Sequence, residues 1–263
     1  MIFKKSLLFI VLNTTLFSNT FTLDYSYGLH DFVVQEESHT VGINAGIYAE
    51  YITSPTTYQN ASFEIFAEHD EEKLDPDHIP VWFRANYGFS TMLTEQDETF
   101  KLNAIVDFDW KMNTVSSVEQ YLKTGLGLEF AFKEGSLRLA PKILFGTYYL
   151  EIDDDVPLDN GFERSDLDVG YKAAVMYGAS MLWDIGKDVS LGVELEEWNE
   201  KGKWLERHVY VELIEKKTEE VTIVFSVEKT IVNLENFRHD GMEILPWNQD
   251  ILFKIVVRLP LDW

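Results

Sequence analysis

The C-terminal stretch DILFKIVVRLPLDW, residues Asp250 to Trp263, decides the fold of this 263-residue chain. One set of alternate positions is apolar throughout: Ile251, Phe253, Ile255, Val257, Leu259, Leu261 and Trp263. The other set includes Lys254, Arg258 and Asp262. Because successive side chains of a β-strand point to opposite faces, the stretch predicts a strand with one apolar face and one partly polar face.

The same period of two recurs along the chain from Phe21 onward. Two further clear examples run from Phe100 to Trp110 and from Leu167 to Trp183, where every second residue is apolar. The pattern predicts about twelve strands, beginning near Phe21, His39, Ala61, Val81, Thr99, Gln120, Leu137, Asp166, Val189, His208, Val221 and Asp250. No later stretch reaches the roughly 18 consecutive apolar residues of a transmembrane helix.

The links between these strands alternate in length. Tight turns are expected at Lys133–Ser136, Asp184–Asp188 and Lys216–Glu220, and longer polar loops at Glu151–Ser165 and Leu234–Gln249. Short turns at one end and long loops at the other are typical of outer-membrane barrels. We therefore predict an all-β fold, a closed antiparallel transmembrane β-barrel of about 12 strands, forming one domain over residues 21–263.

A soluble β-sandwich is the alternative fold, because it would bury the same apolar positions. Aromatic residues near strand ends favour the barrel, since transmembrane barrels carry aromatic girdles at both membrane interfaces. The residues in question are Tyr51, Phe89, Trp110, Tyr149, Trp183 and Trp263.

The stretch Ile251–Trp263 resembles the last strand of bacterial outer-membrane β-barrel proteins, which ends in an aromatic residue read by the barrel-assembly machinery. It departs from that pattern at Leu261, where a second aromatic is common, and at Pro260. The resemblance implies an outer-membrane location, with the lipid bilayer, lipopolysaccharide and the assembly machinery as partners. Small twelve-stranded porins are similar in size only, so no particular family is indicated.

The first 20 residues have the order of a secretory signal. Two lysines precede a short apolar run, Ser6–Phe17, and the small or polar residues Ser18–Thr20 follow. Residues 1–20 are therefore expected to be a signal peptide, and a lipoprotein anchor is not expected because the chain has no cysteine. The formal net charge of -23 also makes nucleic acid an unlikely partner on electrostatic grounds.

The sequence predicts no catalytic, cofactor-binding or metal-binding residues. Phosphate-binding loops, zinc-type clusters and nucleophile elbows are absent from it. An outer-membrane enzyme stays open as an alternative, because His30 and His208 share the inward phase near the outer rim, whereas His39 and His69 face outward. Acidic runs at Asp70–Asp77 and Asp153–Asp159 are expected to be solvated loop surface rather than calcium sites.

The inward phase of the predicted strands carries charges of both signs. Bases dominate strands four to eight, acids dominate strands one to three and nine to eleven, and the last strand adds two bases. The residues predicted to line a pore are Arg84, Lys101, Lys123, Arg138, Lys142, Lys172, Glu50, Glu64, Glu194, Glu212, Lys254 and Arg258. These charges either pair across a narrow, dry interior or face each other across water, where their field would select solutes.

The functional prediction is an outer-membrane channel, porin-like, for passive or weakly selective diffusion of small hydrophilic solutes. The alternative is a non-conducting barrel with a surface-binding or structural role for its outer loops. A barrel of about twelve strands lies between those that side chains fill and those that leave an open channel, so size does not decide between the two.

Overall fold

The computed structural model describes residues 20–34, 38–69, 81–94, 99–112, 118–152, 170–218, 221–233, 236 and 248–260. Twelve strands account for nearly all of them: β1 Thr20–Val34, β2 Ser38–Ser54, β3 Thr57–His69, β4 Val81–Met92, β5 Phe100–Met112, β6 Val118–Glu134, β7 Leu137–Ile152, β8 Gly170–Asp184, β9 Val189–Glu200, β10 Lys203–Lys216, β11 Thr222–Val232 and β12 Asn248–Pro260. In this part of the chain no helix has the length and apolar character needed to span a membrane.

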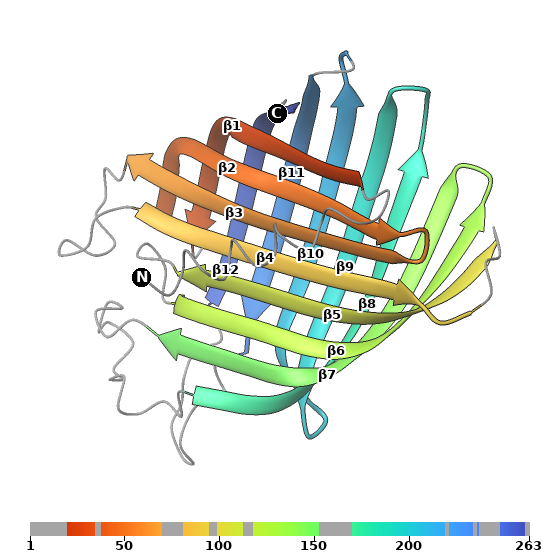
Figure 1. Ribbon diagram of the computed structural model, residues 1–263. Coiled ribbons are helices and arrows are strands. Elements are labelled where there is room, and N and C mark those ends of the chain that lie inside the picture. The colour runs from red at the N-terminus through yellow and green to blue at the C-terminus, as the bar shows by residue number, and fades with distance from the viewer. Residues whose placement is uncertain are drawn as a thin grey trace, which may run out of the picture.

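The strands form one closed antiparallel barrel. Each pairs with its neighbours in sequence, and β1 pairs with β12 to close the wall, with Asp24 opposite Pro260 and Val34 opposite Asp250. Closure satisfies the backbone groups of what would otherwise be two sheet edges. Figure 1 shows the strongly tilted strands, with β1–β4 crossing in front of β9–β11. The predicted fold, a closed antiparallel barrel of twelve strands, is confirmed.

Two strands begin away from the predicted positions, and the predicted start of a third lies outside the described residues. β3 starts four residues before Ala61, at Thr57, because Thr57–Asn60 contains no apolar alternation to mark it. β10 starts at Lys203 rather than near His208, because its register against β9 shifts between Trp204 and Glu206. A shift of this kind breaks the period of two on which the prediction rests. β8 is described only from Gly170, after the predicted start at Asp166.

The outer face of the barrel is apolar. Large side chains such as Ile43, Leu126, Phe145, Tyr171 and Ile255 are exposed on it. On β12, the exposed Phe253 and Ile255 belong to the phase predicted to face outward, whereas Leu252 and Val256 from the other phase are buried. Trp183 is among the exposed residues and Tyr149 packs against Tyr171 with ring centroids 4.8 Å apart.

The two ends of the barrel differ in their connections. At one end, here called the turn end, β2–β3, β6–β7 and β8–β9 are joined by short turns, and β1 begins where β12 finishes. At the other, the loop end, residues 70–80, 153–169 and 233–247 join consecutive strands. The tight β9–β10 turn, where Lys201 and Gly202 have positive φ angles of 49° and 82°, is an exception at the loop end.

Candidate functional site

The barrel interior is the candidate site, and its two halves differ in packing. The half nearer the loop end, here called the packed half, contains the largest fully buried side chains. They are Phe32, Phe66, Trp82, Leu144, Tyr148, Leu150, Met176, Leu205 and Glu206. The half nearer the turn end, here called the polar half, contains a cavity of about 370 Å³.

An aromatic cluster fills one side of the packed half. The rings of Phe66 and Trp82 are stacked, with centroids 3.6 Å apart and planes 5° apart, and Phe32 packs against Trp82 at 5.4 Å. Leu252 completes the cluster, so strands β1, β3, β4 and β12 each contribute one residue. Large inward apolar residues on four strands therefore replace water at this level of the interior.

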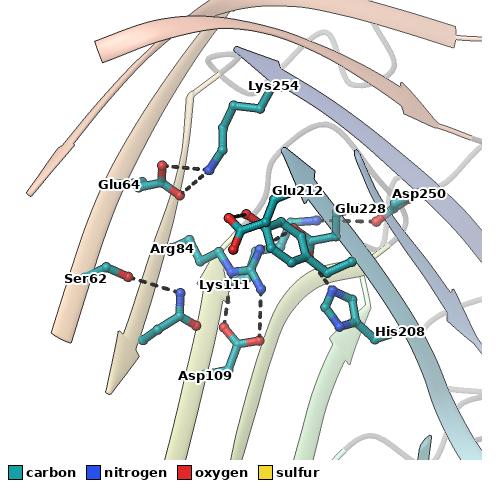
Figure 2. A network of polar contacts seen from close by, with 12 residues as sticks. Ser62, Glu64, Arg84, Asp109, Lys111, His208, Glu212, Glu228, Asp250 and Lys254 are labelled. Atoms are coloured by element: carbon teal, nitrogen blue, oxygen red, sulfur yellow. Dashed lines mark hydrogen bonds and ion pairs between the residues drawn. The ribbon is translucent and has the colours of Figure 1, made fainter. Parts of the chain in front are cut away.

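Ion pairs cross the interior within the packed half. Arg84 on β4 donates to Glu228 on β11 at 2.5 Å, and Lys123 on β6 donates to Glu206 on β10 at 2.7 Å. A third pair joins Lys111 on β5 to Asp250 on β12 at 3.4 Å (Figure 2). The strands of each pair are four or five positions apart in the closed order, so these direct contacts span the interior.

Further hydrogen bonds connect these pairs into one network. Asp109 accepts from Arg84 at 3.3 Å and lies 3.2 Å from the ammonium of Lys123. Glu206 also accepts from the Tyr148 hydroxyl at 2.6 Å. Figure 2 shows Arg84 between Asp109 and Glu228. Several partners for each charge are what makes burial of ions tolerable, because a buried ion without partners is costly.

The cavity of the polar half is lined by groups of both charges. Lys254 donates to both carboxylate oxygens of Glu64, at 2.8 and 2.9 Å. Lys142 lies within 3.4 Å of Asp107 and within 2.7 Å of Glu194 and of Glu196. Tyrosine and amide side chains and apolar residues such as Leu144, Met176 and Val256 complete the lining.

Inward-facing glycines make room for these charged and polar side chains. A Cβ atom at Gly46, Gly88, Gly178 or Gly192 would lie 2.6–3.1 Å from side-chain atoms of Glu64, Asn60, Lys142 and Glu212 respectively. Larger residues there would push the charged groups toward the axis or fill the cavity. The glycines thus belong to the construction of the site although they carry no chemistry themselves.

Eleven of the twelve predicted pore-lining residues fall into three groups. Those around the polar-half cavity are Lys142, Glu64, Glu194, Lys254 and Arg258, together with Arg84 and Lys123, which belong to the packed network and border the cavity from that side. Lys101 and Arg138 line a second cavity, of about 510 Å³, between β5 and β8 at the turn end. Glu50 and Glu212 accept hydrogen bonds from Tyr48 and Tyr210.

Lys172 lies apart from the other bases predicted for its wall. It is near the loop end, at the start of strand β8, with its ammonium 3.7 Å from a carboxylate oxygen of Glu200. The structure therefore brings Arg84, Lys123 and Lys142 around one cavity but does not bring Lys172 to it. The alternation of the sequence predicts that a side chain lies on the inner face of the barrel. Its position along the strand, however, decides which residues it contacts.

Sequence reasoning missed three members of the packed network: Lys111, Glu206 and Asp250. All three have the inward phase, so alternation alone could have identified them. Lys111 and Asp250 lie near strand ends, and Glu206 lies before the predicted start of its strand. Near-complete burial of Glu206 has no signal in the sequence, because it depends on the opposite wall.

The two inward histidines are buried in the packed half and do not form a common site. His30 lies 3.0 Å from Glu68, which also accepts from the Trp82 indole at 2.6 Å. His208 lies 2.8 Å from Glu228, the partner of Arg84. Over the described ranges, no group of three or more metal-ligating side chains is close enough to hold an ion. The acidic runs, residues 1–19 of the predicted signal segment and Trp263 lie outside the described residues, whereas Thr20 begins β1.

Comparison with known proteins identifies the fold but no family. No protein-family model matches the chain, and no curated protein matches its sequence. Among solved structures, the NanC porin matches with a TM-score of 0.51 and 12% identity, covering 91% of this chain and 100% of that one.

The KdgM porin matches with a TM-score of 0.48 and 11% identity over 90% of this chain and 99% of that one. The outer membrane phospholipase A of Escherichia coli matches with a TM-score of 0.44 and 12% identity, covering 90% of this chain and 92% of that one. At these identities the likeness concerns the fold alone: this chain is a closed twelve-stranded barrel, and its fold is similar to that of the NanC porin.

Proposed function

We propose that the chain is an outer-membrane channel for passive or weakly selective diffusion of small hydrophilic solutes. The observation that carries the proposal is the cavity of about 370 Å³ in the polar half, whose lining includes charged groups of both signs with hydroxyl and amide groups, beside apolar side chains such as Leu144 and Met176. A path for hydrated solutes needs charged and polar groups along its wall. The fold shared with the NanC porin supports the same function.

The proposed location is the bacterial outer membrane. An apolar outer face on a closed barrel fits the acyl chains of a bilayer, in which every backbone group must be satisfied internally. Residues 1–20 would direct export, and Ile251–Trp263 would be read by the barrel-assembly machinery. Lipopolysaccharide would surround the loop end.

The packed half restricts this channel. Its cross-interior ion pairs and aromatic rings occupy the level between the cavity and the loop end. Only solutes that fit between these side chains, or that displace them, can pass. We therefore expect small conductance steps from the native barrel rather than the large steps of a wide pore.

A non-conducting barrel is the second candidate, and the same packed half favours it. An interior crossed by several direct ion pairs could serve only to hold the wall rigid, while the loops contact a partner. The two candidates differ in what happens when the packed half is opened. In a channel, removing a large side chain there should widen an existing path, whereas a solid interior should stay silent.

Planar-bilayer recordings of the refolded native barrel and of a Trp82→Ala variant test this proposal. Trp82 is buried in the aromatic cluster, so its truncation should increase the single-channel conductance. The matched control is Trp183→Ala, which removes the same side chain from the exposed outer face of β8 and should leave the conductance unchanged. Silence of both the native and the Trp82→Ala barrels, with folding confirmed, would support the second candidate instead.

The orientation of the barrel is a further proposal. Residues Asp153–Asp159 would lie outside the cell and the turn Lys133–Ser136 in the periplasm, because outer-membrane barrels keep their short turns on the periplasmic side. Single cysteines at Asp155 and at Ser136 can be treated with a membrane-impermeant thiol reagent on intact cells. Labelling at Asp155 alone is the expected result, and labelling at Ser136 alone would reverse the orientation.

A further inference from the structure

The ion pairs around the polar-half cavity are not balanced locally. Three carboxylates, those of Asp107, Glu194 and Glu196, surround the single ammonium of Lys142. Glu196 also has Lys123 and His208 as cationic neighbours, so the local surplus of negative charge belongs to Asp107 and Glu194, which share Lys142. The side chains of Asp107 and Glu194 are 37% and 34% exposed, whereas that of Lys142 is 9% exposed. The surplus therefore faces the cavity, with the ammonium behind it.

Arg258 is the least paired base of the same cavity, because its acidic neighbour Asp24 lies beyond ion-pair distance. Among the described residues it makes no ion pair, and its guanidinium lies 5.2 Å from the ring centroid of Tyr48. Every other base that lines the cavity lies within ion-pair distance of at least one carboxylate. A guanidinium held over an aromatic face keeps its donors available for a planar anion such as a carboxylate.

These two features lie on opposite walls. Arg258 is on β12, whereas Lys142 and Asp107 are on β7 and β5, each five strands from β12 in the closed order. Trp198 also lines the cavity, and its buried indole N–H has no hydrogen-bond partner among the described residues. An unpaired buried donor costs free energy unless a ligand or water accepts its hydrogen bond.

We propose that this cavity binds a small zwitterionic solute, one that carries an ammonium and a carboxylate. The ammonium would lie against Asp107 and Glu194, and the carboxylate toward Arg258. A zwitterion satisfies both walls at once, whereas a simple cation or anion satisfies one and leaves the other unpaired. The volume of about 370 Å³ suits a molecule of amino-acid size. The inference rests on the proposed function, because it names the class of solute that the channel would select.

Isothermal titration calorimetry on the full refolded barrel in detergent tests the inference with three probes of equal chain length. The probes are γ-aminobutyrate, butylamine and butyrate, which carry both charges, only the positive charge and only the negative charge. We expect γ-aminobutyrate to bind with a Kd at least about tenfold lower than either of the others. Equal or tighter binding of butylamine or of butyrate, or no binding of any probe, would overturn the inference.

Two variants test the roles of the walls. Arg258→Gln should reduce the affinity for γ-aminobutyrate to that for butylamine, and Glu194→Gln should reduce it toward that for butyrate. The matched controls are Arg207→Gln and Glu197→Gln, which remove the members of an ion pair at 2.7 Å on the exposed outer phase near the loop end. The controls should not change binding. Loss of γ-aminobutyrate binding in the controls as well would contradict the assignment to this cavity.

Conductance measured on the same preparation separates the inference from the proposed function. A barrel that conducts but does not prefer γ-aminobutyrate over butylamine and butyrate would overturn the inference and leave the channel. A barrel that binds γ-aminobutyrate but stays silent, also as Trp82→Ala, would overturn the channel and leave the zwitterion site. If a wall variant fails to fold, the three probes on the native barrel still decide the outcome.

Discussion

The packed and polar halves of the interior contain the same types of charged residue, but these residues have different roles. In the packed half, Lys123 and Glu206 form an ion pair whose side chains are 3% and 0% exposed. In the polar half, Lys142 meets carboxylates that keep about a third of their surface exposed. Pairing is common to both, so the difference lies in access to solvent. A buried pair holds the barrel together, whereas a solvated pair is available to a passing solute.

The largest effect is expected when one partner of a buried pair is removed. Lys123→Gln leaves Glu206 without its cation, so it should lower the free energy of unfolding by about 3–5 kcal/mol. Arg138→Gln, at the Asp184 pair near the turn end whose side chains are 52% and 38% exposed, should cost only a small fraction of that, because solvent screens an exposed pair. Guanidinium unfolding of the barrel in detergent micelles measures both. Equal losses would show that the buried and the exposed pair do not differ in energetic character.

Truncation of an apolar residue should cost more stability in the packed half than on the outer face. Leu144 is fully buried in the packed half, so Leu144→Ala should cost about 2–5 kcal/mol through lost contacts and a residual cavity. Leu126 on the neighbouring strand is 66% exposed on the outer face, and Leu126→Ala should cost less than about 1 kcal/mol. The unfolding midpoints of the two variants compare the same change in the two environments. A larger loss of stability for Leu126→Ala would show that the packed half does not contribute more to stability than the outer face.

A smaller difference is expected at the inward glycines. A Cβ at Gly42 would collide with the backbone oxygen of Ala67 and would also approach the ring of His30, so Gly42→Ala should destabilise by about 1–3 kcal/mol. A Cβ at Gly192 would meet only the side chain of Glu212, which can move into the cavity. Gly192→Ala should therefore change stability by less than about 0.5 kcal/mol. Similar midpoints for the two variants would contradict tight packing around Gly42.

Selectivity should respond in the polar half. Lys142→Gln leaves the carboxylates of Asp107, Glu194 and Glu196 without their cation, so reversal potentials in a salt gradient should move toward cation preference. Lys172→Gln, which lies away from the cavity, should shift them less. The shift of the reversal potential is expected to be larger for Lys142→Gln than for Lys172→Gln. A larger shift for Lys172→Gln would place the selective region at the loop end.

The wall of the barrel could be predicted from the sequence, but its interior could be predicted only in part. Alternation in stretches such as Ile251–Leu259 gives strand, face and approximate length, because the period of two is a local property. Contact between Arg84 and Glu228 depends on the tilt and stagger of strands far apart in the chain, which no local pattern encodes. The packed half had one visible signal, since Phe32, Phe66 and Trp82 are large apolar residues in an otherwise polar phase.

The ion pairs that cross the interior also set an order of events during assembly. Their partners are distant in the chain: Arg84 and Glu228 are 144 residues apart, and Lys111 and Asp250 are 139 apart. A sheet that grows hairpin by hairpin cannot form these contacts until its first and last strands meet. Until then the charges stay hydrated, so closure of the wall should come first and expulsion of water from the packed half last. Long-range contacts of this kind make a slow final step, during which a barrel of native outline would still be wet inside.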